Sequence, residues 1–111
     1  MSIFIDASAF IALMDSDDEF HSAAANLFKE AVESDEKFFT SNYVLLETIF
    51  LLQREIGLPA VNDFRKLMLP LVIVIWVDEK INNDCLNNLI AAEKRKISLT
   101  DYSFFCCYQI T

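Results

Sequence analysis

Along this chain, short apolar segments typical of strands alternate with longer segments of helical periodicity. We expect the strands at residues 2–6, 37–40, 71–77 and 97–99. We expect the helices at residues 7–14, 19–34, 42–55, 60–69 and 79–94, with a last helix starting at residue 100 or 101. Strands that are joined by helical crossovers run parallel and form one sheet with helices on its faces. The pattern therefore predicts an α/β fold with a mainly parallel, four-stranded sheet and about six flanking helices.

Three acidic residues stand near the points where strands pass into helices. Asp6 ends the first apolar segment, Glu47 lies early in the helix after the second, and Asp101 follows the fourth. The carboxyl ends of parallel strands converge on one crevice, which is where such sheets bind ligands. Three carboxylates in one crevice repel one another unless a cation lies between them. The pattern therefore indicates a metal site, and Mg²⁺ and Mn²⁺ are the ions that prefer oxygen ligands of this kind.

Each of these acids also has a simpler explanation. Asp6 and Asp101 precede helices, where a carboxylate commonly caps the N-terminus. Glu47 could face solvent, as most Glu residues do, although apolar residues on most sides of its helix favour burial and therefore a partner. Capping and metal binding can use different oxygens of one carboxylate, so both explanations stay open.

Composition limits the number of domains and the way in which the chain can bind a partner. With 111 residues, 54% of them hydrophobic, the chain is expected to form one domain over residues 1–111. The net charge is −8 and the only dense basic run is at residues 94–96, so no broad basic surface is available for a nucleic-acid backbone. The three cysteines lack the spacing of a zinc site, and reduced thiols are expected. No targeting or membrane-spanning segment is evident, which favours a cytoplasmic protein.

Four segments in order give the chain a resemblance to a known family. They are IDASAFIAL at residues 5–13, FHSAA at 20–24, TSNYVLLE at 40–47 and SLTDYSF at 98–104. With Asp6, Glu47 and Asp101 each in such a context, the chain resembles the PIN domain ribonucleases, and among them the VapC-type toxins of toxin–antitoxin pairs. PIN domains usually continue into a fifth strand that carries a fourth acid. Here the sequence ends before that segment, so we expect a three-layer PIN-like fold that is C-terminally incomplete relative to the family.

The resemblance implies a metal-dependent endoribonuclease that hydrolyses RNA phosphodiester bonds. Asp6 and Asp101 would bind Mg²⁺ or Mn²⁺, and Glu47 would hold the attacking water or a second ion. Ser8, Asn42 and Thr100 are candidates to support these carboxylates by hydrogen bonds. Toxins of this type are generally cytoplasmic homodimers that are bound by a cognate antitoxin, so RNA, an antitoxin and a second copy of the chain are the implied partners.

A second functional class remains open from the sequence alone. The absent terminal segment and the acidic composition also suit a degenerate PIN fold that binds protein or RNA without cutting it. An aspartyl-phosphate enzyme of the haloacid dehalogenase type is less suitable, because such enzymes carry a second Asp where this chain has Ser8. A dinucleotide-binding fold is excluded, since a single Gly in the whole chain cannot build a glycine-rich turn.

Overall fold

A parallel sheet forms the centre of the computed structural model, which describes residues 2–92. Its strands are β1 (Ser2–Phe4), β2 (Lys37–Ser41) and β3 (Val72–Ile75), in the order β1-β2-β3. Both pairings are parallel, as the helical crossovers predicted. The strand expected at residues 97–99 and the helix expected after it lie outside the described residues.

Five α-helices connect and extend these strands within residues 2–92. They are α1 (Ala7–Met14), α2 (His21–Glu33), α3 (Asn42–Glu55), α4 (Leu58–Asp63) and α5 (Glu79–Ala92). The observed bounds of α1 and α3 are those that the sequence predicted. One continuous helix over residues 60–69 was the wrong expectation, because α4 passes into a π-helical turn (Phe64–Met68) and a 3-10 turn (Leu69–Leu71). Pro70 lies in that last turn, where its missing N–H prevents a regular helix from continuing.

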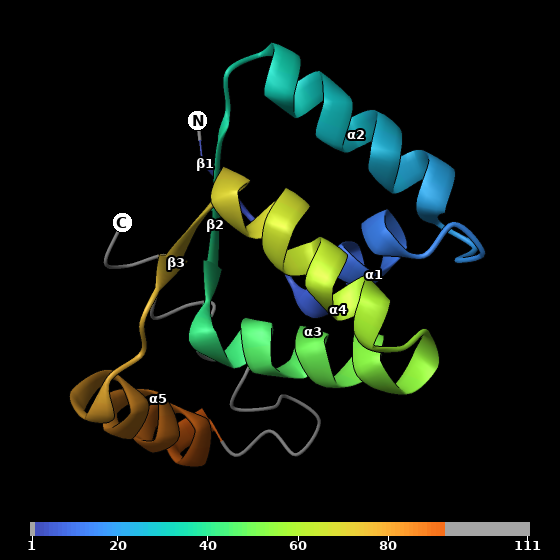
Figure 1. The fold of residues 1–111 in the computed structure, drawn as a ribbon. Helices are drawn as coiled ribbons and strands as arrows, with labels where there is room; N and C mark the ends of the chain where they lie inside the picture. The colour runs from blue at the N-terminus through green and yellow to red at the C-terminus, as the bar shows by residue number, and fades with distance from the viewer. Residues whose placement is uncertain (1, 93–111) are drawn as a thin grey trace.

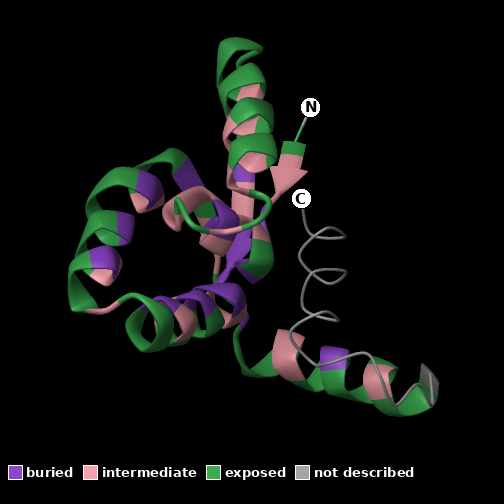
Figure 2. Ribbon diagram, turned by 90° about the vertical axis from the view of Figure 1, so that its right-hand side faces the viewer, coloured by how far each residue is buried: buried purple, intermediate pink, exposed green. Residues whose placement is uncertain are grey.

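The helices are divided unequally between the two sides of the sheet (Figure 1). α1, α3 and α4 form a layer on one side, whereas α5 leaves the end of β3 and projects away from that layer. The buried residues gather between the sheet and this helical layer (Figure 2). Phe10 of α1 and Phe64 of the π-helical turn are fully buried there, with their ring centroids 5.0 Å apart in an edge-to-face arrangement. These contacts fix where α1 begins, and hence where Asp6 lies.

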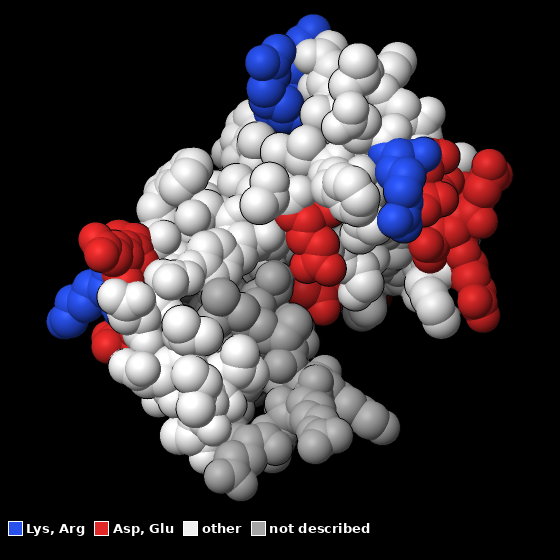
Figure 3. All heavy atoms as spheres, turned by 90° about the horizontal axis from the view of Figure 1, so that it is seen from below, with Lys and Arg blue, Asp and Glu red and all other residues white. Residues whose placement is uncertain are grey.

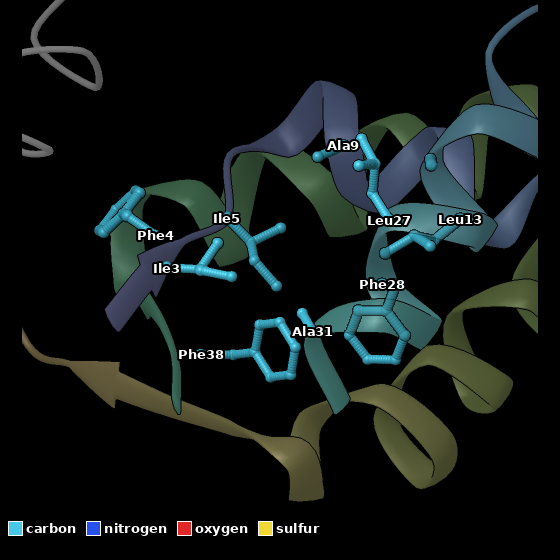
Figure 4. Close-up of a pocket in the computed structure, with 10 residues that line it drawn as sticks. Ile3, Phe4, Ile5, Ala9, Leu13, Leu27, Phe28, Ala31 and Phe38 are labelled. Atoms are coloured by element: carbon cyan, nitrogen blue, oxygen red, sulfur yellow. The ribbon is translucent and has the colours of Figure 1, made fainter. Parts of the chain in front are cut away.

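α2 packs against α1 at the margin of this core. None of its residues is buried, and its main aromatic contact is Phe28 stacked on Phe38 of β2, with centroids 4.7 Å apart. Beside this stack lies an apolar cavity of about 220 Å³, lined by side chains of β1, β2, α1 and α2. Figure 4 shows Ile3, Leu27 and Phe28 around it.

Two residues in the described part of the chain bear on how α3 ends and on the state of the cysteines. Gly57 follows α3 with φ of 128°, a conformation that side chains disfavour, and its N–H donates to the Leu52 carbonyl at 2.9 Å, so it terminates the helix. Cys85 on α5 is fully buried and disulfide-bonded, which corrects the expectation of a reduced thiol.

None of the helices in residues 2–92 has both the length and the apolar character needed to cross a membrane.

Candidate metal centre at the carboxyl edge of the sheet

The three strands end at one edge of the sheet and at nearly the same level. Phe4, Phe39 and Ile73 are in register across the sheet, and the Ile5 N–H extends the ladder by donating to the Phe39 carbonyl at 2.8 Å. The chain leaves this edge through Asp6, through the start of α3 and through Trp76. Figure 3 looks onto the edge: one group of acidic side chains lies near the middle of the face, and others lie at its left and right margins beside Lys and Arg side chains.

Asp6 occupies the junction of β1 and α1 and is exposed to solvent. Its Oδ1 accepts two hydrogen bonds, one from the Ala9 N–H at 2.9 Å and one from the Ser8 hydroxyl at 2.9 Å. Asp6 is therefore the N-cap of α1. Within residues 2–92, no hydrogen bond involves its Oδ2. One oxygen thus holds the rotamer while the other is available to a ligand, so capping and metal binding are compatible in this carboxylate.

Glu47 lies in the second turn of α3 and is exposed as well. It makes no hydrogen bond or ion pair with the described residues, and its neighbour Leu46 is 73% exposed. The apolar residues of α3 therefore do not enclose it on all sides, and of the two positions that the sequence left open for Glu47, the one facing solvent is observed. Val44, Thr48 and Leu52 form the buried face instead, which leaves the Glu47 carboxylate free to meet a ligand from solvent.

The junctions of β1 and β2 are tied together beneath these acids. Thr40, which is fully buried at the end of β2, donates its hydroxyl to the Ile5 carbonyl at 2.9 Å. Ser41 then caps α3 by accepting from the Val44 N–H at 3.2 Å. The Thr40 bond joins the end of β2 to Ile5, the residue before Asp6, and the Ser41 bond joins the same end of β2 to α3. The starts of α1, which Asp6 caps, and α3, which carries Glu47, are therefore held in place relative to each other.

Asn42 and Tyr43, the first two residues of α3, hold the segment that leaves β3. The Asn42 amide accepts from the Val77 N–H at 2.6 Å and donates to the Val77 carbonyl at 3.4 Å. Both ends of this amide are therefore engaged with backbone, where the sequence had suggested a hydrogen bond to a carboxylate. The Tyr43 hydroxyl donates to Asn82 of α5, and partial burial raises the pKa of Tyr43 above its ordinary value.

The described residues supply only part of the predicted ligand set. Asp101 and Thr100 lie outside them, and within residues 2–92 no three His, Cys, Asp or Glu side chains gather closely enough to hold a metal ion. The donors that are present, one open carboxylate oxygen on Asp6 and the free carboxylate of Glu47, are hard oxygen ligands and suit Mg²⁺ or Mn²⁺. Sequence reasoning overlooked Thr40, Tyr43 and Trp76 at this edge. Of these, only Trp76 carries a local signal, as an aromatic residue near the end of the most strand-like segment.

Comparison with known proteins finds similarity over nearly the whole chain. The PIN domain family model matches residues 3–101, a span that includes Asp6, Glu47 and Asp101. The fold is similar to the crystal structure of Mycobacterium tuberculosis VapC20, described as a sarcin-ricin loop cleaving toxin, with a TM-score of 0.80 and 28% sequence identity. That similarity covers 97% of this chain and 82% of the VapC20 chain. Comparison with curated protein sequences finds no significant match.

Proposed function

Because this chain belongs to the PIN domain family, we propose that it is a metal-dependent endoribonuclease of the VapC toxin type. The observation that carries the proposal is the position and hydrogen bonding of the Asp6 carboxylate. Its carboxylate stands at the carboxyl edge of β1, is oriented by Ser8 and the Ala9 N–H, and keeps one oxygen open toward solvent. A helix cap requires only the hydrogen bond from the Ala9 N–H, so the additional bond from Ser8 favours a further role for this carboxylate. The similarity to a ribonuclease toxin over nearly the whole chain supports metal binding as that role.

The proposed roles follow from the position of each carboxylate. Asp6 and Asp101 would hold Mg²⁺ or Mn²⁺, and Glu47 would hold a water or a second ion. A bound divalent ion supplies charge compensation at the phosphate and lowers the pKa of a coordinated water. Ser8 keeps the Asp6 carboxylate in one orientation, and Thr100 is proposed to do the same for Asp101. Asn42 acts at a distance, by holding Val77 at the same edge.

RNA is the proposed substrate, and a cognate antitoxin and a second copy of the chain are the proposed protein partners. VapC20 is described as a toxin that cleaves the sarcin-ricin loop, which supports RNA as the substrate class. On α3, Leu46 and Phe50 are 73% and 56% exposed, and apolar side chains of this kind suit a protein interface. We further propose that residues 1–111 act as one domain in the cytoplasm.

The test is cleavage of a mixed RNA pool by the purified chain with Mn²⁺. We expect cleavage that EDTA stops and that Asp6→Asn reduces by at least about a hundred-fold, since the variant loses a charged ligand. Asn caps helices as well as Asp does, so the variant should unfold at the same denaturant concentration as the wild type. Equal cleavage by Asp6→Asn would refute the role of Asp6.

The proposed metal site depends on a residue outside the described part of the chain. Within residues 2–92 no three metal-binding side chains cluster, so the site depends on Asp101 for its third ligand. A folded wild-type chain that binds Mn²⁺ and RNA but leaves the RNA intact would replace the nuclease proposal with a binding function. Asp101→Asn provides the matching measurement, because it should abolish cleavage as fully as Asp6→Asn does.

A further inference from the structure

The single tryptophan of the chain is exposed at the candidate metal centre. Trp76 directly follows β3 at the carboxyl edge of the sheet, and 70% of its surface is accessible. Tryptophan is usually well buried in folded proteins because its large apolar surface is costly to leave in water. An exposed tryptophan ring offers a large flat apolar surface to a ligand.

The backbone on both sides of Trp76 is held firmly. Ile75 pairs with Ser41 in the parallel ladder, and the Val77 backbone makes two hydrogen bonds with the Asn42 amide. The Val77 side chain is only 7% exposed and anchors the following residue in the protein. An exposed ring on such a backbone loses little freedom when it binds, which favours affinity.

Trp76 also lies at the right level relative to Asp6. The register that aligns Phe4, Phe39 and Ile73 places Asp6 opposite Ser41 and Ile75, so Trp76 is one residue beyond Asp6 along the strand direction. By this register the backbone positions of Asp6 and Trp76 are two strand spacings apart, which amounts to roughly 10 Å. A nucleotide next to a phosphate at Asp6 could therefore reach the ring.

Resting on the proposed ribonuclease function, we propose that Trp76 is a stacking platform for an unpaired RNA base beside the scissile phosphate. The net charge of −8 limits what a basic surface can contribute to RNA binding. Stacking on an aromatic ring needs no positive charge and occurs with every base, so it supplies affinity by a route that an acidic protein can use. It also selects single-stranded or looped RNA, since paired bases are not free to stack on the protein.

Because Trp76 is the only tryptophan, its fluorescence reports on this ring alone. The experiment titrates the Asp6→Asn protein, which should not cut, with an unstructured oligouridine and with a perfectly paired RNA duplex. We expect quenching by oligouridine and weaker binding of the duplex. In that background Trp76→Ala should weaken oligouridine binding on the order of ten-fold, measured by fluorescence anisotropy of labelled RNA, whereas Trp76→Phe should retain most of it.

Phe20→Ala is the matched control, because Phe20 is an exposed aromatic residue in the loop before α2 and should leave RNA affinity unchanged. Equal RNA affinity in Trp76→Ala and the parent would overturn the stacking role. Trp76 emission that shifts with protein concentration in the absence of RNA, together with a monomeric Trp76→Ala, would also overturn it and assign the ring to a protein interface. If the wild type fails to cleave RNA, the proposed nuclease activity is refuted. The stacking proposal is tested separately, because RNA binding is measured in the Asp6→Asn variant, which should not cleave.

Discussion

At the scale of single residues, Asp6 has two separable tasks. Oδ1 caps α1 through the Ala9 N–H and accepts the Ser8 hydroxyl, whereas Oδ2 makes no hydrogen bond within the described residues. The capping task needs only an oxygen acceptor, which Asn also provides. The proposed metal-binding task needs the negative charge, which Asn lacks. Stability and activity should therefore respond differently to substitution at this one position.

Comparing Asp6→Asn with Asp6→Ala separates these tasks. Asp6→Ala should lower the free energy of unfolding by about 1 kcal/mol, the usual cost of losing an N-cap, whereas Asp6→Asn should leave it nearly unchanged. Both variants should lose RNA cleavage. Urea denaturation followed by circular dichroism measures the first effect. Ser8→Ala is the companion variant, since it removes one hydrogen bond to Oδ1 and leaves the cap. Equal stability of Asp6→Ala and the wild type would show that the cap contributes little.

At the scale of elements, the start of α3 organises the edge of the sheet. Asn42 is bonded to Val77, which lies 35 residues further along the chain and joins β3 to α5. Within residues 2–92, α5 has no extensive packing against other elements, so the Asn42 amide and the Tyr43 hydroxyl, which bonds Asn82, link α5 to the sheet. The position of Trp76 depends on the same link.

Asn42→Ala should therefore loosen the junction of β3 and α5 without disturbing the core. Two hydrogen bonds are lost, each with a net value of about 0.5–1.5 kcal/mol. We expect the Val77 amide to exchange its hydrogen faster, because its acceptor is the Asn42 side chain. Asn42→Asp keeps that acceptor and should retain most of the protection. Hydrogen exchange followed by NMR compares the variants, and unchanged exchange at Val77 in Asn42→Ala would contradict the link.

Sequence patterns predicted those elements whose signals are local. The bounds of α1 and α3 were correct because capping residues and apolar periodicity mark them within a few residues of chain. The turn Phe64–Met68 was missed because no nearby residue distinguishes π from α winding. Two details of the site were missed or left open for another reason. The partner of Asn42 and the solvent exposure of Glu47 depend on how distant segments pack, which local periodicity does not contain.

At the scale of the whole molecule, the charge of the chain opposes its proposed substrate. A net charge of −8 repels a polyanionic RNA over distances beyond direct contact. Salt screens this repulsion, with a Debye length of about 30 Å at 0.01 M and about 8 Å at 0.15 M. Proteins that bind nucleic acid through a basic surface behave in the opposite way, because salt weakens counterion release. The direction of the salt effect therefore tells which force dominates RNA association.

We expect kcat/KM for RNA cleavage to rise as KCl is increased over this range at constant Mn²⁺, since faster association follows from weaker repulsion. Replacing the exposed α2 acids Glu30 and Glu33 with Lys changes the net charge from −8 to −4 and touches no predicted site residue. This variant should cleave faster than the wild type at low salt, show a shallower salt dependence and keep the same kcat at saturating RNA. A steep fall of kcat/KM with KCl would instead assign RNA association to a local basic contact, for which the run at residues 94–96 is the candidate.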